Sequence, residues 1–229
     1  MFIMSFKKFL VYLSKRISRK NLISFLEKDL LNIKNSGKKI SLLNVGSGGE
    51  IEKSIKKYNF FNIKSIDIDH LRKPDQVLDV CDYDFEKKLG HTVNCIVISE
   101  VIEHLKDPFL AIHNLKKVLE KDGFMIVTSP FILGIHDEPN DYFRYTKYGL
   151  KLLLKDFKII DLKQRNNGLM DIIFILLIRS FQDKKFINKA FGSAVLIIYY
   201  LLFPIVYFLN IFLKSEKITT GYYVLAVKK

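Results

Sequence analysis

Residues 42–50, which are the most informative about the fold class, read Leu42-Leu43-Asn44-Val45-Gly46-Ser47-Gly48-Gly49-Glu50. A short apolar run bounded by turn residues is typical of a buried strand, and glycines directly after it let a ligand approach the backbone closely. A polar helical pattern follows at about 50–58. The order strand, glycine turn, helix predicts the start of an open α/β sheet with a ligand at the turn. A tight turn without a ligand is the alternative.

Two common nucleotide sites are disfavoured by the residues of this turn. The dinucleotide fingerprint requires a third glycine at position 51, where Ile51 stands. A P-loop requires Gly-Lys followed by Ser or Thr, which the turn lacks. The turn therefore favours a different small ligand.

Short apolar runs alternate with helical patterns on both sides of the turn. We expect strands at 41–45, 63–68, 76–80, 94–99, 124–128, 157–162 and 222–227. We expect helices at about 21–35, 50–58, 108–121 and 146–155, the third ended by Asp122-Gly123. Strands that alternate with helices predict a parallel sheet with helices on both faces.

Polar side chains follow the strands where each one ends. Asp67 lies at the carboxyl end of the second strand, where a carboxylate can accept both hydroxyls of a ribose. Asp79 and Asp82 follow the third, within reach of an adenine amine, and Ser99 and Glu100 end the fourth. Open α/β sheets bind ligands at this edge. Each acid taken singly could instead cap a helix, but the ordered set at successive strand ends favours a ligand site.

With these motifs the chain resembles the class I S-adenosylmethionine-dependent methyltransferases of the broad type-11 kind, over about 40–165 plus the last strand. The most specific match is the run Ser-Glu-Val-Ile-Glu-His-Leu-Lys-Asp-Pro at 99–108. The resemblance implies a Rossmann-like α/β fold. Its seven-stranded, mostly parallel sheet would have an antiparallel last strand between the fifth and sixth. Asn44 and Glu50 depart from the family, which usually has an acid and a third glycine there.

The resemblance implies S-adenosyl-L-methionine as the cofactor and assigns its contacts. The residues so implied are Asn44, Gly46, Ser47, Gly48, Asp67, Asp79, Asp82, Ser99 and Glu100. Asp67 would hold the ribose, and either Asp79 or Asp82 would face the adenine, with Asp79 favoured.

The segment after the fifth strand reads Gly-Ile-His-Asp-Glu-Pro-Asn-Asp-Tyr-Phe-Arg-Tyr-Thr at 134–146. It resembles the His-x-x-Pro-x-Asp-Tyr-x-Arg-Tyr-Thr run of methyltransferases associated with glycan and bacterial cell-envelope synthesis. His136 is our candidate catalytic base. The candidate substrate contacts are Asp137, Tyr142 and Arg144.

The same segment has a purely structural interpretation. In it, Arg144 pairs with Asp141 and Thr146 caps the next helix. We interpret His104 as packing or capping rather than catalytic. The remaining histidines show no metal-ligand spacing, so we predict no metal site.

The net charge of +13 is concentrated in the two flanks. Residues 1–40 hold 10 basic and 2 acidic residues, residues 41–157 hold 16 and 18, and residues 158–229 hold 11 and 4. A near-neutral middle argues against nucleic acid, and basic flanks favour an anionic phospholipid surface. A general lysine bias is the alternative. The two cysteines, Cys81 and Cys95, cannot build a disulfide framework.

The N-terminal region predicts a basic amphipathic helix rather than a secretory signal. Its apolar stripe consists of Phe2, Phe6, Phe9, Leu10, Leu13 and Ile17. Such a helix can lie on a membrane or pack on the domain.

The run 190–213 carries no charge in 24 residues and contains Pro204, which we expect to kink it. If the strands at 157–162 and 222–227 share a sheet, a single crossing is excluded, because both ends of the insertion return to one domain. A re-entrant hairpin, a helix in the interfacial plane, a hydrophobic lid and a dimer interface remain.

We therefore predict four regions: 1–39, amphipathic; 40–165, the methyltransferase core; 166–217, a membrane-associated insertion; and 218–229, the last strand. The expected activity is O-directed methylation of a membrane-borne or cell-envelope glycan or lipid-linked acceptor, on the cytoplasmic side of a membrane. The alternatives are a small lipophilic acceptor of quinone type and a degenerate, non-catalytic membrane scaffold. The oligomeric state is left open.

Overall fold

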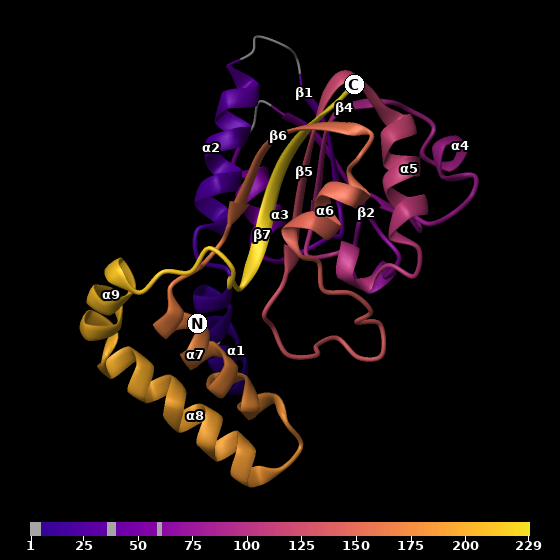
Figure 1. The fold of residues 1–229 in the computed structure, drawn as a ribbon. Coiled ribbons are helices and arrows are strands. Elements are labelled where there is room, and N and C mark those ends of the chain that lie inside the picture. Colours follow the sequence, from indigo (N-terminus) through magenta and orange to yellow (C-terminus); the bar gives the residue numbers. More distant parts are fainter. Residues whose placement is uncertain (1–5, 36–39, 59–60) are drawn as a thin grey trace. The chain divides into compact units, whose positions relative to one another are not determined.

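The computed structural model describes residues 6–35, 40–58 and 61–229, and the chain divides into two compact units (Figure 1). The core unit comprises Leu22–Pro130, Asp137–Lys163 and Tyr222–Lys229. The helical unit comprises Met1–Asn21, Phe131–His136 and Gln164–Gly221. The division separates the two helices of the predicted N-terminal region, so that only the second belongs to the core unit.

The core unit is built on a seven-stranded sheet in the order β3-β2-β1-β4-β5-β7-β6. The strands are β1 (Ile40–Val45), β2 (Phe61–Asp67), β3 (Gln76–Val77), β4 (Val93–Ser99), β5 (Leu119–Pro130), β6 (Phe157–Gln164) and β7 (Gly221–Lys228). The pairs β1–β2, β1–β4, β2–β3 and β4–β5 are parallel, and the last strand is antiparallel. The predicted fold class is confirmed, including the position of the last strand between the fifth and sixth.

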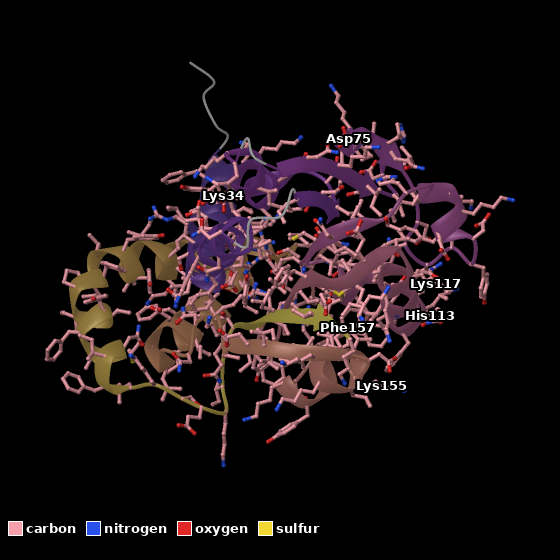
Figure 2. All side chains as sticks on the ribbon, turned by 90° about the horizontal axis from the view of Figure 1, so that it is seen from above. Lys34, Asp75, His113, Lys117, Lys155 and Phe157 are labelled. Atoms are coloured by element: carbon pink, nitrogen blue, oxygen red, sulfur yellow. The ribbon has the colours of Figure 1, made fainter. Side chains whose placement is uncertain are left out.

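Five α-helices and two 3₁₀ turns accompany this sheet within the described residues. They are α2 (Leu22–Lys34), α3 (Gly49–Lys56), η1 (His70–Arg72), α4 (Phe85–Leu89), η2 (Ile102–His104), α5 (Pro108–Val118) and α6 (Lys147–Leu153). Buried side chains of α2, α3, β1, β4 and β7 form one apolar cluster. The charged side chains of Lys117 and Lys155 are exposed, whereas Phe157 at the start of β6 is buried (Figure 2).

The end of α5 differs from the sequence prediction. The helix stops at Val118 instead of Lys121, and β5 begins at Leu119, which pairs with Val93. The register shifts by the next pair, and Asp122 adopts φ = 58°. Leu119 is buried beneath the backbone of Gly123. Burial of this leucine ends the helix early, and Asp122-Gly123 lies within β5 beside the shift in its register.

The helical unit contains α1 (Phe6–Ser18), α7 (Leu169–Ile178), η3 (Arg179–Gln182), α8 (Phe186–Leu201) and α9 (Phe203–Phe212). Leu10 and Ile17 of the predicted stripe are buried against α7 and α8, and Phe9 is exposed. Phe2 lies outside the described residues, and the side chain of Phe6 is not described.

A buried carboxylate joins three parts of the helical unit. Asp171 of α7 accepts hydrogen bonds from Lys20 Nζ, Asn166 Nδ2 and Tyr199 Oη, each at 2.9 Å. Its side chain is 1% exposed. A charge so deeply buried is tolerated only when it is paired. Asp171 therefore links α8 to α7 and to the segment after α1.

None of the described helices is by itself long and apolar enough to cross a membrane. Together, α8 and α9 meet the requirements of length and composition, but they are bent by 77° at their junction. The break falls at Leu202, and Pro204 lies in the first turn of α9. Proline is favoured in the first turn of a helix because the N–H groups there have no hydrogen-bond partner within the helix, so the N–H that proline lacks is not needed. The predicted kink is therefore present, two residues before the proline.

Candidate functional site

The glycine turn joins β1 to α3. Gly46, Gly48 and Gly49 adopt φ values of 89°, 90° and 75°, a region that glycine enters without strain. A Cβ atom on Gly48 or Gly49 would meet nothing within 4 Å, so the backbone there is open to a ligand. Gly49, one position before Glu50, is the third glycine of the turn with a positive φ. Glu50 lies exposed in the first turn of α3.

Asn44 holds the turn from within the sheet. Its side chain is buried, and its Nδ2 donates to the carbonyl oxygen of Gly46 at 2.9 Å. The N–H of Gly46 donates in turn to the carbonyl of Ile66 on the neighbouring strand β2 at 2.9 Å. The amide thus fixes the first glycine although the usual acid is absent.

Asp67 connects the end of β2 to the glycine turn. Its Oδ2 accepts the backbone N–H of Ser47 at 2.7 Å, and its Oδ1 accepts that of Asp69 at 2.9 Å. The Arg72 Nε lies 3.8 Å from Oδ2. A carboxylate oxygen has two acceptor sites, so each keeps one for a further donor. The structure therefore brings the predicted turn and the predicted ribose acceptor into direct contact.

Glu52 is a residue of this turn that the sequence reasoning missed. Its carboxylate accepts hydrogen bonds from the N–H of Gly48 and from Ser47 Oγ, and it pairs with Lys56. Desolvation raises the pKa of Glu52, but these three partners outweigh it and hold the pKa below its ordinary value. An acid one turn into the helix that follows a glycine turn is the signal that could have indicated it.

The two candidates for the adenine side are held differently. Asp82 pairs with Lys88 at 2.7 Å, whereas Asp79 Oδ1 accepts the N–H of Cys81 at 2.8 Å. The side chain of Asn114 fastens the loop between them by donating to the carbonyls of residues 80 and 82, at 2.9 and 2.8 Å. Since Asp79 is not paired with a cation among the described residues, it is the better candidate acceptor.

Ser99 and Glu100 lie where β4 ends, beside the end of β5. The hydroxyls of Ser99 and Thr128 are 2.7 Å apart, and Thr128 Oγ1 donates to Glu100 Oε1 at 3.1 Å. Glu100 adopts φ = 57°, a strained conformation that clusters at functional sites in proteins. The neighbouring strand ends are thus bridged by polar groups at the edge where a ligand is expected.

The loop after residue 136 is held by a partly buried ion pair. Arg144 donates two bonds to the carboxylate of Asp141, both at 2.6 Å, and this pairing raises the pKa of Arg144. Thr146 Oγ1 accepts the N–H of Gly149 at 3.1 Å and caps α6. The structure therefore contains both the Arg144–Asp141 pair and the Thr146 cap of the structural interpretation, and Arg144 holds the loop in place.

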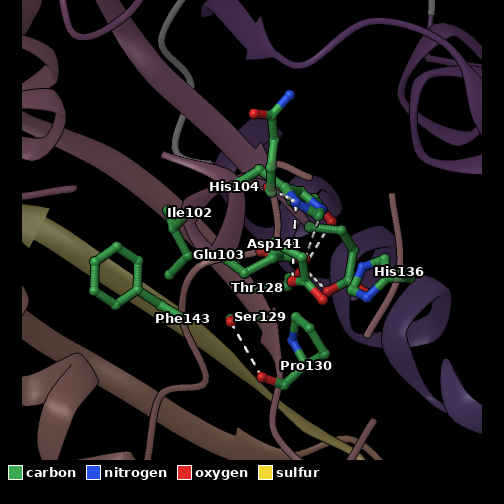
Figure 3. Close-up of polar contacts among 12 residues, drawn as sticks. Ile102, Glu103, His104, Thr128, Ser129, Pro130, His136, Asp141 and Phe143 are labelled. Carbon is green, nitrogen blue, oxygen red and sulfur yellow. Dashed lines mark hydrogen bonds and ion pairs between the residues drawn. The ribbon is translucent and has the colours of Figure 1, made fainter. Parts of the chain in front are cut away.

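Glu103 and His104 fasten the same loop to the end of β4, and the sequence reasoning assigned no role to Glu103. The carbonyl of Glu103 accepts the N–H groups of Tyr142 and Phe143 at 2.9 and 3.1 Å. The imidazole Nε2 of His104 lies 3.7 Å from Glu103 Oε1, and its Nδ1 lies 4.0 Å from Asp141 Oδ1 (Figure 3). His104 thus packs in the loop, as predicted.

The remaining candidates are less enclosed. Tyr142 is exposed and its hydroxyl donates to Asn140 Oδ1 at 2.8 Å, while Asp137 is exposed with φ = 52°. His136 ends the middle segment of the helical unit, with Nδ1 3.4 Å from the carbonyl of Gly134. Phe131, at the start of that segment, donates its N–H to the carbonyl of Thr220 at 2.9 Å. His136 therefore belongs to a different unit from the glycine turn, and its role stays a prediction.

A family model for a methyltransferase domain matches residues 14–153, which is more than half of the chain. The chain belongs to this methyltransferase family. No curated protein matches its sequence.

Solved structures share the fold of this methyltransferase. A protein of Galdieria sulphuraria assigned as a sarcosine dimethylglycine methyltransferase is 13% identical, with 91% of this chain and 86% of that chain covered and a TM-score of 0.60. An S-adenosylmethionine-dependent methyltransferase of Archaeoglobus fulgidus is 16% identical, with 95% and 99% covered and a TM-score of 0.56. Phosphoethanolamine N-methyltransferase 2 of Haemonchus contortus, solved with S-adenosyl-L-methionine, is 17% identical, with 88% and 52% covered and a TM-score of 0.51.

The cofactor of this methyltransferase is S-adenosyl-L-methionine, and the residues at the sheet edge fit it. The open backbone at Gly48 and Gly49 leaves room that a side chain would fill. Asp67 keeps acceptor sites for a diol beside that turn. When bound, the cofactor supplies an electrophilic methyl group on a sulfonium. Much of what the protein contributes is then the positioning of donor and acceptor.

Proposed function

We propose that this methyltransferase acts on a hydroxyl of a membrane-borne or cell-envelope glycan, or of a lipid-linked glycan precursor, on the cytoplasmic side of a membrane. The observation that carries the proposal is the loop 137–146. Its Asp141–Arg144 pair and its bonds to Glu103 hold it beside the end of β4, while Tyr142 and Asp137 stay exposed. A loop that presents polar and aromatic groups suits a sugar, which binds through hydrogen bonds and ring contacts.

A hydroxyl acceptor must lose its proton during transfer, so the proposal assigns a base. His136 has that role, because imidazole accepts a proton near neutral pH. Its side chain is partly exposed at the point where the chain passes from the helical unit to the loop. Asp137 and Tyr142, which follow, are the proposed sugar contacts.

A small lipophilic acceptor of quinone type is the second candidate, favoured by the exposed apolar side chains of the helical unit such as Leu201 and Phe212. The degenerate, non-catalytic reading loses its support. Asn44 still holds the glycine turn, and Glu50 points into solvent instead of obstructing it.

Mass spectrometry of envelope glycans and lipids tests the proposal. Cells that produce the wild-type protein should contain a glycan or lipid-linked glycan heavier by one CH₂ group than the same molecule from cells without it. Asp67→Ala should abolish the difference, and Asp69→Ala, which alters a neighbouring exposed acid, should preserve it. A CH₂ difference found only in free quinones would replace the proposed acceptor with the second candidate. Identical glycans and lipids in all cells would refute both.

A further inference from the structure

The helical unit exposes an unusually apolar surface. It is formed by α8 and α9 and is defined here by Ile187, Leu201, Phe203, Ile205, Phe208 and Phe212. These side chains are between 43% and 78% exposed. Soluble proteins seldom leave contiguous apolar patches of this kind uncovered, so the apolar surface marks a site of interaction.

The opposite faces of the same helices are also apolar. Val195, Leu196 and Tyr199 of α8 and Val206 of α9 are buried in a cluster with Ile175 of α7. Each helix is therefore hydrophobic on both sides, packed against the unit on one and open on the other. Helices that are apolar all round require a second apolar environment, either another protein or a membrane.

The charges around the apolar surface identify which environment it is. Residues 190–213 carry no charge. The flanking segments carry exposed lysines, namely Lys184, Lys185, Lys189, Lys214 and Lys217. Over 179–217 there are six basic residues against two acidic ones, Asp183 and Glu216. An apolar centre with cations at its borders matches an anionic bilayer, with acyl chains beneath negative headgroups. A second copy would bring like charges to the same borders.

The lengths of α8 and α9 and the bend between them limit how these helices can bind a bilayer. With 16 residues α8 is about 24 Å long, and with 10 residues α9 is about 15 Å long. Both are shorter than the hydrocarbon core of roughly 30 Å. They bend by 77° at Leu202, and the insertion starts and ends in strands β6 and β7, which are neighbours in one sheet. The chain must therefore leave the bilayer on the side from which it entered.

We propose that α8 and α9 are an interfacial docking site for an anionic phospholipid bilayer. Both helices lie within one leaflet, with the apolar surface among the acyl chains and the flanking lysines among the headgroups. The inference rests on the proposed function for the nature of the acceptor, because docking would bring the enzyme to a lipid-linked glycan. Docking itself needs no acceptor and is measured without one.

Vesicle flotation of the purified full-length chain tests the docking site. The vesicles are phosphatidylcholine alone, or phosphatidylcholine with roughly a quarter phosphatidylglycerol. The test variant is Leu201→Ser with Phe208→Ser, which removes side chains that are 74% and 59% exposed. The matched control is Tyr148→Ser with Leu152→Ser on α6 of the core unit, where the side chains are 68% and 60% exposed. Circular dichroism checks that all variants fold.

The wild type should float with both vesicles, and more strongly with phosphatidylglycerol at low salt. The Leu201/Phe208 variant should bind at least about tenfold more weakly, and the Tyr148/Leu152 control should bind like the wild type. Lys214→Gln with Lys217→Gln should reduce the preference for phosphatidylglycerol.

Three results would overturn the inference: a wild type that does not float, equal losses in test and control variants, or a test variant that floats normally but changes from dimer to monomer. The last would assign the apolar surface to a second copy. Strong flotation without any methylated glycan would support the docking site and contradict the proposed acceptor. A methylated glycan made by a protein that does not float would support the proposed acceptor and contradict the docking site.

Discussion

Replacing Asp67 by alanine should weaken cofactor binding strongly and leave the fold intact. A hydrogen bond to a charged acceptor contributes about 1.5–3 kcal/mol. Two ribose hydroxyls on the carboxylate would then account for about 3–6 kcal/mol, a rise in Kd of roughly 10²- to 10⁴-fold. The change also removes the acceptor of the Ser47 N–H at 2.7 Å, at a cost to folding stability of about 1–2 kcal/mol. Isothermal titration with S-adenosyl-L-methionine measures the first effect, and urea unfolding measures the second.

Asp69→Ala is the matched control for this experiment. The Asp69 side chain is 43% exposed, and its Oδ1 accepts the N–H of Leu71 at 2.9 Å, which caps the short turn η1. The control should change the cofactor Kd by less than about threefold, since it removes only an exposed cap and a contact of 3.8 Å with the Nε of Arg72. If Asp67→Ala also stayed within that range, the carboxylate could not be the ribose acceptor.

Three further substitutions, one of them with a matched control, probe the turn and the base. Glu52→Gln should weaken cofactor binding by about tenfold, because it removes the charge that accepts the Gly48 N–H. Glu50→Gln on the same helix should have no effect, and equal titration results for the two variants would contradict this role of Glu52. Gly46→Ala puts a methyl group 2.5 Å from a Val101 methyl, at a residue whose φ is 89°. It should lower the free energy of unfolding in urea by about 2–4 kcal/mol. A change near zero would mean that the two methyl groups do not approach so closely. His136→Ala should lower kcat by about 10²- to 10⁴-fold with unchanged cofactor affinity, and a full rate would exclude it as the base.

The fold could be predicted because the information is local. Apolar runs, glycine turns and helical periods specify each element from neighbouring residues, and the alternation of strands and helices specifies the sheet. The end of α5 could not be predicted, since it depends on the burial of Leu119 against a distant strand. In the same way, the role of Glu103 depends on its carbonyl oxygen, which the folded loop brings to the N–H groups of Tyr142 and Phe143. The pairing of Arg144 with Asp141, three residues apart, could by contrast be predicted from their spacing.

A crystal structure of the full chain with S-adenosylhomocysteine would show directly whether the glycine turn and Asp67 bind the cofactor. We expect both ribose hydroxyls within hydrogen-bonding distance of the Asp67 carboxylate, and the homocysteine part along the backbone of Gly46–Gly48. A ligand bound elsewhere, or a ribose held by other residues while Asp67 bonds only the turn, would contradict this expectation.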